Sequence, residues 1–414
     1  MAKNVLIAQS GGPTAAINAS LAGVIARCLE SGEAGEIYGA LNGMDGILAR
    51  RIIDLRAQTR GGADLERLSA SPAMALGSCR RKLPELGAEW DSIPAVYEKI
   101  ESVFRKFHIG FFFYIGGNDS MDTAKKVDAY FRRKASDIRV IGVPKTIDND
   151  LPVTDHTPGY GSAAKYVAAT MLEIGRDCSI YDIPSVTIVE IMGRGAGWLA
   201  AAAAVPRYLG EPMPQLVYLP EAPFETGRFL EDIRREMGKR KGVVAAISEG
   251  VRTSDLSAGG REETDAFGHA QLAGIACRLE QLVRGQIGCK TRAIQLNIMQ
   301  RCAFHLASQT DVDEARLIGR KAAEAAFAGK TGRCMCFRRT PGEVYGVEVE
   351  DCDLGLVANR EKKFPAQWIN DAGNGIREEG VRYILPLIRG RAEYPENDYL
   401  PDYFRFDRER LAAP

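Results

Sequence analysis

Residues 111–120 read FFFYIGGNDS, and this stretch decides the fold class. The apolar run Phe111–Ile115 has the length and the aromatic content of a buried β-strand, and it ends on two glycines. A helical pattern of apolar residues follows near Met121–Arg133. The stretch therefore predicts a strand whose carboxyl end turns sharply into a helix.

The same arrangement recurs along the chain. Apolar runs that end in glycine or in a polar cluster are Val5–Ala8, Val140–Val143, Val186–Ile191 and Val243–Ile247. Strands that alternate with helices indicate a mainly parallel sheet with helices on both faces. In such sheets ligands bind beyond the carboxyl ends of the strands, where these polar clusters fall. The sequence therefore predicts an α/β protein whose site is assembled from several strand ends.

The composition is that of an ordinary globular protein, with 414 residues, 45% of them hydrophobic and 26% charged. This length predicts two or three domains, and two more apolar segments, Tyr345–Val349 and Tyr383–Ile388, stand near the end. Lysine plus arginine (54) balances aspartate plus glutamate (54), which argues against a nucleic-acid or anionic-membrane partner. No apolar run reaches the roughly 18 residues of a membrane helix. Nine cysteines without zinc spacing indicate reduced thiols in a cytoplasmic protein.

Two glycine loops are candidates for binding phosphate groups. Ser10–Thr14 (SGGPT) lets the backbone turn and lets an anion approach its amides, although a plain tight turn explains it equally well. It lacks the third glycine of a dinucleotide-binding fingerprint, which argues against a dehydrogenase. In the second loop, Asn118 and Asp119 could hold magnesium or orient a phosphate, or they could cap the following helix.

The heptad PKTIDND, residues 144–150, carries the strongest chemical signal. Lys145 can neutralise a phosphate as a point charge. Asp148 could accept a hydroxyl proton, and Asp150 could support a metal or Lys145. A phosphoryl transfer requires in-line placement, charge neutralisation and a base. The heptad therefore favours that reaction over the alternative of an Asx-rich surface turn.

Further charged residues stand at later strand ends. Arg194, in a glycine-rich turn, suits a substrate phosphate, although it could instead pair with Glu190. Glu249 could hydrogen-bond sugar hydroxyls, and Arg292 and Arg301 add two cations. Glu249, Arg292 and Arg301, each taken alone, are more often ordinary surface charges.

Taken together, the motifs resemble the 6-phosphofructokinase family. The matching segments follow the family's order, and they are Gly11-Gly12, Gly116–Ser120, Pro144–Asp150, Met192–Arg194, Glu249-Gly250 and Gln300-Arg301. The resemblance implies two Rossmann-like doubly wound domains with mainly parallel sheets. In that arrangement, residues 1–160 with 302–345 bind the phosphoryl donor, residues 161–301 bind fructose 6-phosphate, and residues 346–414 form a C-terminal extension.

The resemblance also implies roles for individual residues. Asp148 looks like the base that takes the proton from the sugar 1-hydroxyl. Gly12 and Arg80 look like donor-phosphate contacts, and Asn118 stands at the family's magnesium-binding position. The residues that resemble fructose 6-phosphate contacts are Thr146, Ile147, Met192, Gly193, Arg194, Glu249, Arg292, Ile298, Met299, Gln300 and Arg301.

Two further catalytic candidates, Asp119 and Lys145, distinguish between phosphoryl donors. ATP-dependent members resemble GGDGS and PGTIDND, with glycine at both positions. Asp119 would occupy the space of a nucleotide α-phosphate and repel its charge. Lys145 can stabilise the transferring and leaving phosphates of pyrophosphate. The chain therefore resembles the pyrophosphate-dependent type.

Other positions differ from the bacterial allosteric members. Ala22 and Ala26 replace effector-binding arginines, which argues against that form of regulation. Ser185 replaces an arginine that reaches the substrate of a neighbouring subunit, and Ile298 replaces a sugar-phosphate histidine. The expected assembly is a homodimer or a homotetramer.

The expected reaction is the Mg²⁺-dependent, reversible transfer of phosphate from pyrophosphate to the 1-hydroxyl of fructose 6-phosphate. It gives fructose 1,6-bisphosphate and phosphate, in glycolysis or gluconeogenesis. One alternative is an ATP-dependent 6-phosphofructokinase. Another is a non-catalytic phosphosugar or nucleotide sensor, since a fold alone does not fix function. A sensor, however, has no need of Asp148 beside a lysine.

Overall fold

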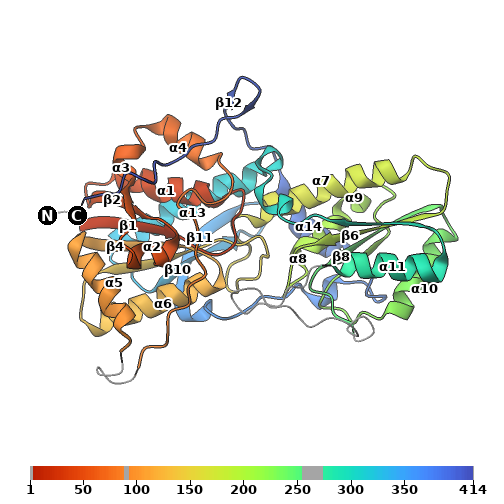
Figure 1. Ribbon diagram of the computed structural model, residues 1–414, viewed down its shortest axis with the longest axis horizontal. Coiled ribbons are helices and arrows are strands. Elements are labelled where there is room, and N and C mark those ends of the chain that lie inside the picture. Colours follow the sequence, from red (N-terminus) through yellow and green to blue (C-terminus); the bar gives the residue numbers. More distant parts are fainter. Residues whose placement is uncertain (1–2, 88–92, 254–273, 414) are drawn as a thin grey trace.

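The computed structural model describes residues 3–87, 93–253 and 274–413. Two main β-sheets lie toward opposite ends of the long axis of the molecule, and helices cover both faces of each (Figure 1). We call the part built on the seven-stranded sheet the large lobe and the part built on the four-stranded sheet the small lobe. This architecture confirms the predicted α/β class with mainly parallel sheets.

The sheet of the large lobe has parallel inner strands and two antiparallel edge strands. Across the sheet the strands are β11 (Val347–Asp353), β10 (Arg333–Arg339), β5 (Arg139–Pro144), β4 (Ile109–Gly116), β1 (Lys3–Gln9), β2 (Ala34–Ala40) and β3 (Ile52–Asp54). Ala8 pairs with Tyr114, and Gly116 pairs with Pro144. The loops that follow β1, β4 and β5 therefore leave the sheet at the same end.

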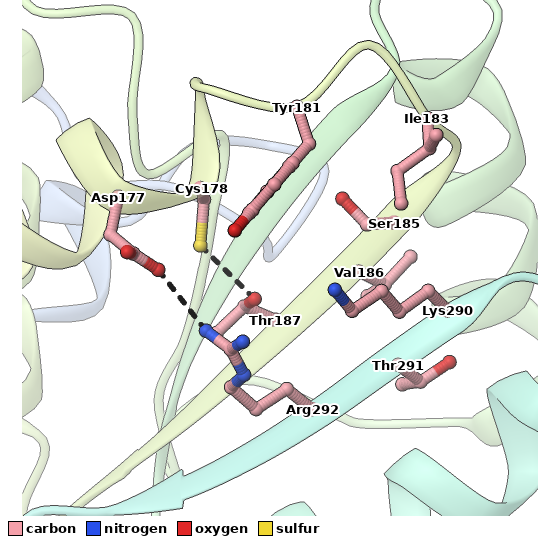
Figure 2. A pocket seen from close by; sticks show the side chains of 10 residues that line it. All are labelled: Asp177, Cys178, Tyr181, Ile183, Ser185, Val186, Thr187, Lys290, Thr291 and Arg292. Atoms are coloured by element: carbon pink, nitrogen blue, oxygen red, sulfur yellow. Dashed lines mark hydrogen bonds and ion pairs between the residues drawn. The ribbon is translucent and has the colours of Figure 1, made fainter.

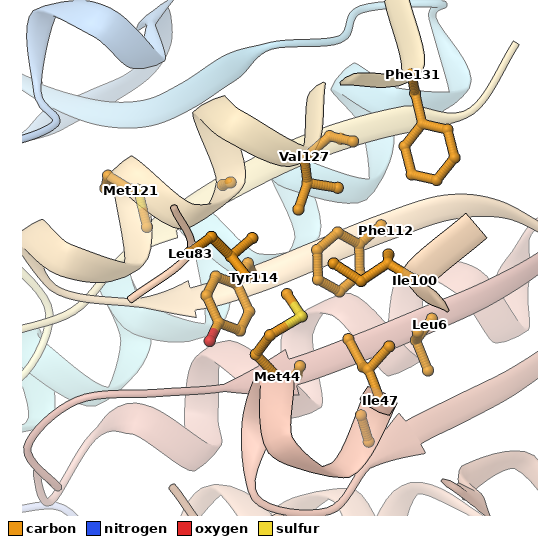
Figure 3. Close-up of a cluster of buried hydrophobic side chains, with 14 of the residues drawn as sticks. Leu6, Met44, Ile47, Leu83, Ile100, Phe112, Tyr114, Met121, Val127 and Phe131 are labelled. Carbon is orange, nitrogen blue, oxygen red and sulfur yellow. The ribbon is translucent and has the colours of Figure 1, made fainter. Parts of the chain in front are cut away.

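Buried side chains on both faces hold this sheet in place. Every residue of β4 is buried, and Phe112 and Tyr114 point into one hydrophobic cluster while Phe111, Phe113 and Ile115 point into another. Figure 3 shows the first cluster. The helices around it are α2 (Gly43–Leu48), α5 (Ala95–Lys106) and α6 (Asn118–Arg133). The helices of the second face are α1 (Ile17–Glu30), α3 (Leu55–Gln58), α4 (Gly62–Ser69) and α13 (Gln309–Phe327).

Helices α1 and α13 approach each other closely at two glycines. A Cβ atom at Gly23 would lie 2.1 Å from the carbonyl oxygen of Arg316, and one at Gly319 would lie 2.1 Å from that of Ser20. A side chain at either position would therefore push the helices apart. Helix α13 comes after the small lobe in the sequence. Its contact with α1 therefore places the chain in the large lobe a second time.

The small lobe is built on a parallel sheet of four strands. Across the sheet they are β7 (Leu216–Tyr218), β8 (Gly242–Ser248), β6 (Ser185–Ile191) and β9 (Lys290–Gln295). Val189 and Ile191 are buried on one face, and Val186 and Ile188 on the other. The helices of this lobe are α7 (Tyr160–Cys178), α8 (Trp198–Ala201), α9 (Val205–Tyr208), α10 (Thr226–Met237) and α11 (Ile275–Ile287).

The segment expected as a C-terminal extension is shared between the lobes. After β11, its elements are α14 (Glu378–Ile384), β12 (Glu396–Asn397) and β13 (Leu400–Pro401). β11 extends the sheet of the large lobe, whereas Phe364 and Ile384 are buried in the core of the small lobe. Phe406 is buried in the large lobe again. The expected domain boundaries stay a prediction. Within the described ranges, no helix is long and apolar enough to cross a membrane.

Candidate active site

A cleft of about 500 Å³ lies between the lobes, at the carboxyl ends of their strands. The large lobe contributes the loops after β1, β4 and β5, and the small lobe contributes those after β6 and β8. Parallel sheets place ligand sites at this end. The sequence-predicted residues that line the cleft are Gly12, Arg80, Asn118, Asp119, Lys145, Thr146, Ile147, Asp148, Met192, Arg194, Glu249 and Arg301.

Lys145 is a buried cation in the wall of the cleft, with 1% of its surface exposed. Its Nζ donates a hydrogen bond to the carbonyl oxygen of Gly12, and its main-chain N–H donates to that of Gly116 at 2.9 Å. These bonds tie together the loops after β1, β4 and β5. Burial lowers the pKa of Lys145 to about 8, although the Asp148 and Asp150 charges oppose this shift.

The two carboxylates of the heptad line the same cleft. Burial raises the pKa of Asp148, while the Lys145 charge opposes the rise. Burial and the Asp148 charge raise the pKa of Asp150 to about 7. The main-chain N–H of Asp148 donates to Thr146 Oγ1 at 3.1 Å, which helps to turn the chain at this point. A carboxylate with a raised pKa is suited to exchange a proton near neutral pH.

Asn118 and Asp119 stand at the start of α6 and line the large-lobe side of the cleft. Asn118 Nδ2 donates to the carbonyl oxygen of Arg360, whereas its Oδ1 is buried without a hydrogen-bond partner. This amide oxygen fits the oxygen ligands that Mg²⁺ requires. Asp119 is half exposed, and its Oδ1 lies 3.4 Å from Lys82 Nζ. In the part of the chain that the structure describes, no cluster of three His, Cys, Asp or Glu side chains could hold a metal by itself.

Arg301 brings a cation from the small-lobe side to the glycine loop Ser10–Thr14. It lies in the short helix α12 (Met299–Cys302), and its Nη1 is 3.7 Å from the position of a Cβ atom at Gly12. Burial lowers the pKa of Arg301, and the neighbouring Arg80 charge adds to this effect. Two guanidinium groups beside a buried lysine make this part of the cleft suitable for a polyanion.

Glu249 organises the glycine turn of the small lobe. The Gly193 N–H donates to Glu249 Oε1 at 3.3 Å, and Arg194 Nε lies 3.9 Å from the same oxygen. Burial raises the pKa of Glu249, although the Gly193 N–H lowers it. Gly193 is thus held next to the cleft by a residue that lines it, without being a lining residue itself.

Three predicted contacts lie at the margin of the cleft or outside it. Gln300 is buried, and its Oε1 accepts a hydrogen bond from the Met192 N–H at 3.2 Å. It therefore orients a lining residue. Ile298 and Met299 are 57% and 47% exposed and do not line the cleft.

Arg292 lies away from the cleft, in a second and smaller cavity of the small lobe (Figure 2). It belongs to the edge strand β9, and its Nη1 lies 3.2 Å from Asp177 Oδ2. Tyr181, Ser185 and Lys290 line the same cavity. Arg292 therefore does not meet a ligand in the cleft of its own chain.

Sequence reasoning missed Asn359 and Glu361, which line the cleft from the segment after β11. Asn359 Nδ2 donates to Asp122 Oδ1 at 2.9 Å, and Glu361 pairs with Lys363 at 2.7 Å. Glu361 also lies against Gly195, where a Cβ atom would be 2.4 Å from its Oε1. The polar run around them has the composition of an exposed loop, so no local signal marks it. Further lining residues that were not assigned a role are Cys79 and Arg81.

Known proteins similar to this chain place it in a family. A profile described as Phosphofructokinase matches residues 4–326. The chain is 39% identical to the pyrophosphate–fructose 6-phosphate 1-phosphotransferase of Halomonas elongata, over 99% of this chain and 97% of that protein. It is 40% identical to the protein of the same name from Xanthomonas campestris, over 97% and 95%. Its fold is similar to that of the pyrophosphate-dependent phosphofructokinase from Nitrosospira multiformis, with a TM-score of 0.88, 36% identity, and 99% and 97% of the two chains covered. The chain therefore belongs to the phosphofructokinase family.

Proposed function

We propose that the protein is a pyrophosphate-dependent 6-phosphofructokinase. It transfers a phosphoryl group from pyrophosphate to the 1-hydroxyl of fructose 6-phosphate and releases phosphate, in a reversible reaction. The observation that carries this proposal is a buried lysine, Lys145, beside the Asp148 carboxylate in a cleft with arginines from both lobes. The names of the relatives support the donor and the acceptor.

Asp148 accepts the proton of the 1-hydroxyl as that oxygen attacks the nearer phosphorus of pyrophosphate. The new O–P bond forms while the bond from that phosphorus to the bridging oxygen breaks, and the second phosphate leaves as a free ion. Lys145 stabilises the negative charge that develops on the transferring and leaving groups. In the reverse reaction the protonated Asp148 returns its proton, which fits a carboxyl whose pKa is raised by burial.

Asn118 is the residue that would hold Mg²⁺, through its unpartnered Oδ1. When bound, the ion neutralises phosphate charge and orients the donor. A neutral amide is a weak ligand, so phosphate oxygens of the donor would have to supply most of the coordination. The hydrogen bond from Asn118 Nδ2 to the Arg360 carbonyl fixes the amide and leaves the oxygen free for this purpose.

The two substrates bind at opposite sides of the reacting residues. The donor phosphates contact Gly12, Arg80 and Lys145 of the large lobe. The acceptor sugar phosphate contacts Thr146 and Ile147 of the loop after β5 and, on the small-lobe side, Met192, Gly193, Arg194, Glu249 and Arg301. Asp119 excludes ATP, because its carboxylate would meet a third phosphate that pyrophosphate does not have.

A homo-oligomer completes the proposed site. Arg292 lies on the edge strand β9 and lines one cavity together with the exposed side chains of Tyr181 and Ile183. A second copy of the chain that covers this edge would receive Arg292 at its own cleft. The protein therefore acts as a homodimer or a homotetramer, and its nine free cysteine thiols fit a cytoplasmic location.

The test is an assay of two donors against two acceptors. Purified protein receives pyrophosphate or ATP with fructose 6-phosphate or sedoheptulose 7-phosphate. We expect kcat/KM for pyrophosphate with fructose 6-phosphate to exceed that for ATP by at least about 100-fold. Turnover with ATP and not with pyrophosphate would instead establish an ATP-dependent enzyme.

Replacement of Asp148 by Asn separates an enzyme from a sensor. Asp148→Asn keeps the size of the side chain but removes the base, so we expect kcat to fall by about 10²- to 10⁴-fold. Calorimetric titration with fructose 6-phosphate should show that binding persists in the variant. Turnover that is unchanged in Asp148→Asn would refute the proposed mechanism, and binding without turnover in the wild-type protein would favour the sensor.

A further inference from the structure

The loop that carries the two cleft carboxylates, residues 148–155, follows a strained course. We call it the carboxylate loop. Asn149 has a φ of 53° and Val153 a φ of 72°, and both lie in the left-handed region that favours glycine. The region is especially unfavourable for a β-branched side chain such as that of Val153. Such a conformation persists only where surrounding contacts hold it.

Lys362, in the segment after β11, holds the carboxylate loop from one side. Its main-chain N–H donates to the carbonyl oxygen of Asp150 at 2.6 Å. Its Nζ donates to the carbonyl oxygens of Thr154 at 3.0 Å and Asp155 at 2.6 Å. The same ammonium lies 4.9 Å from the centre of the Trp198 ring, which anchors it to the small lobe.

Tyr383, on α14, holds the loop through a single hydroxyl. Asn149 Nδ2 donates to Tyr383 Oη at 2.9 Å, and this hydroxyl donates onward to the carbonyl oxygen of Asp155 at 2.6 Å. One oxygen atom therefore joins the left-handed Asn149 to the far end of the loop. The tyrosine ring contacts Trp198 and Trp368, with centroid distances of 5.1 Å and 5.5 Å, so the hydroxyl has a fixed position.

The far end of the loop is also anchored to the large lobe, through Arg339, which contacts the Tyr383 ring as well. The Asp155 carboxylate lies 3.0 Å from His156 Nδ1 and accepts a hydrogen bond from Arg339 Nη2 at 3.0 Å. Lys362 and Tyr383 do not line the cleft, and their contacts with the loop are to main-chain atoms and to Asn149. They act on the course of the loop, whereas Asp148 and Asp150 line the cleft itself.

We propose that Lys362 and Tyr383 are positioning residues for the reaction, which hold the carboxylate loop so that Asp148 and Asp150 face the cleft. This inference rests on the proposed function. It gives a role to a segment beyond residue 326, where the family match ends. Alignment of the reacting atoms is strict, so displacing Asp148 by about 1 Å would lower the rate by about 100-fold.

The test compares four variants. Tyr383→Phe removes one oxygen atom, Lys362→Met removes the ammonium group, and Lys362→Arg restores a donor. Tyr218→Phe is the matched control, because its hydroxyl donates to buried Asp232 at 2.9 Å and Tyr218 does not line the cleft. The measurements are kcat, KM for both substrates, the melting temperature, and amide hydrogen exchange of residues 148–155.

We expect Tyr383→Phe and Lys362→Met to lower kcat by about tenfold or more, with both KM values within about threefold of wild type. Lys362→Arg keeps the positive charge and N–H donors, so its kcat should lie above that of Lys362→Met. Exchange of the loop amides should accelerate by about tenfold in Tyr383→Phe and stay unchanged in Tyr218→Phe. The melting temperatures of the two tyrosine variants should be similar.

Three results would overturn the inference. The first is a decrease of kcat in Tyr383→Phe or Lys362→Met that is no larger than the decrease in Tyr218→Phe. The second is a change of KM in these variants with kcat unchanged. The third is a kcat of Lys362→Arg as low as that of Lys362→Met. If Lys362→Met does not fold, Tyr383→Phe decides. A wild-type protein inactive with pyrophosphate would refute the proposed function, whereas loop exchange would still test the positioning role.

Discussion

At the scale of single residues, Lys145 is a cation in a place where charge is costly. It is almost fully buried, and burial lowers its pKa to about 8. In the proposed reaction its protonated form is the one that stabilises the leaving phosphate. Lys145 holds this proton below pH 8 and loses it as the pH rises through that value.

We therefore predict that kcat/KM for pyrophosphate falls above about pH 8 and approaches a tenfold loss per pH unit. A pH–rate profile between about pH 6 and pH 10 measures this limb, because kcat/KM reports the ionisations of the free enzyme. Lys145→Met should have low activity and no such limb. A wild-type profile that stays flat to about pH 9.5 contradicts the assignment of Lys145.

Asp119 gives the second prediction for a residue. The double variant Asp119→Gly with Lys145→Gly should have a higher kcat/KM for ATP. Its kcat/KM for pyrophosphate should be lower by at least about 10²-fold. Loss of Asp119 removes the repulsion of a third phosphate and frees Lys82, its partner at 3.4 Å. Donor assays of the double variant measure this change. The control is Asp371→Gly, which removes an exposed pair with Arg377, and an unchanged donor preference in the double variant counts against the argument.

The site residues that could be predicted from the sequence are those that follow the ends of strands. Lys145 and Asp148 follow directly after an apolar run, so their place beside the glycine loops could be predicted from the rule for parallel sheets. Ile298 and Met299 could not be excluded in this way, because their exposure depends on how α12 meets the lobes. No local sequence pattern predicts that Glu361 lines the cleft, because its position depends on contacts between segments far apart in the sequence.

At the scale of elements, the contact of α1 with α13 allows a test of stability. Gly23→Ala should lower the free energy of unfolding by about 1–3 kcal/mol, because the new methyl group meets a backbone carbonyl at 2.1 Å. Urea unfolding followed by circular dichroism measures the change.

Gly285→Ala is the control for this prediction. Gly285 lies in α11, and among the described residues no atom outside its two chain neighbours and the backbone of its own helix lies within 4 Å of the position of its added Cβ. Alanine favours a helix there, so we expect the stability to change little or to rise by about 0.4–1 kcal/mol. Equal changes in the free energy of unfolding for Gly23→Ala and Gly285→Ala would show that the close approach of α1 and α13 is not the cause of the lost stability.

Elements with a strong local pattern were predictable. The aromatic run of β4, buried along its whole length, and the glycines after it indicated a strand and a following helix. The apolar segment Tyr345–Val349 was visible as well, but the strand β11 is Val347–Asp353 and pairs antiparallel with β10. Three of its seven residues are exposed at the edge of the sheet, so hydrophobicity alone gave neither its bounds nor its partner.

At the scale of the whole molecule, the position of Arg292 predicts complementation between subunits. Arg292→Ala and Arg301→Ala should each lower kcat/KM by about 10- to 100-fold, because each removes a charge that we propose contacts the sugar phosphate. In a mixed dimer, one of the two clefts contains both arginines. Equal amounts of the two variants, co-expressed, should therefore recover about a quarter of the wild-type activity.

The control is the pair Arg194→Ala and Arg301→Ala. Both residues line the same cleft of one chain, so every cleft of a mixed oligomer lacks one of the two arginines. Recovery in this control pair, or none in the first pair, contradicts the shared site. Sedimentation velocity of each preparation should show the same oligomer.

The family and the fold class were predictable, because the ordered motifs are themselves local in the sequence. Their confirmation comes from the family match over residues 4–326 and from the similarity to solved structures. The surroundings of Arg292 were not predictable, since it stands at the outer edge of the small-lobe sheet. Its proposed role depends on a second chain, which one sequence does not place.

The return of the chain to the large lobe has a consequence for the order of folding. β5 pairs with β10, yet residues 145–332 separate the two strands in the sequence. During synthesis, β6 to β9 all emerge before β10 does, so the small-lobe sheet has all of its strands while the large-lobe sheet still lacks two. Until β10 arrives, β5 presents an open edge that could pair with another chain. We therefore expect chains interrupted before residue 333 to aggregate, and a nascent chain of this length to be the species that most needs protection in the cell.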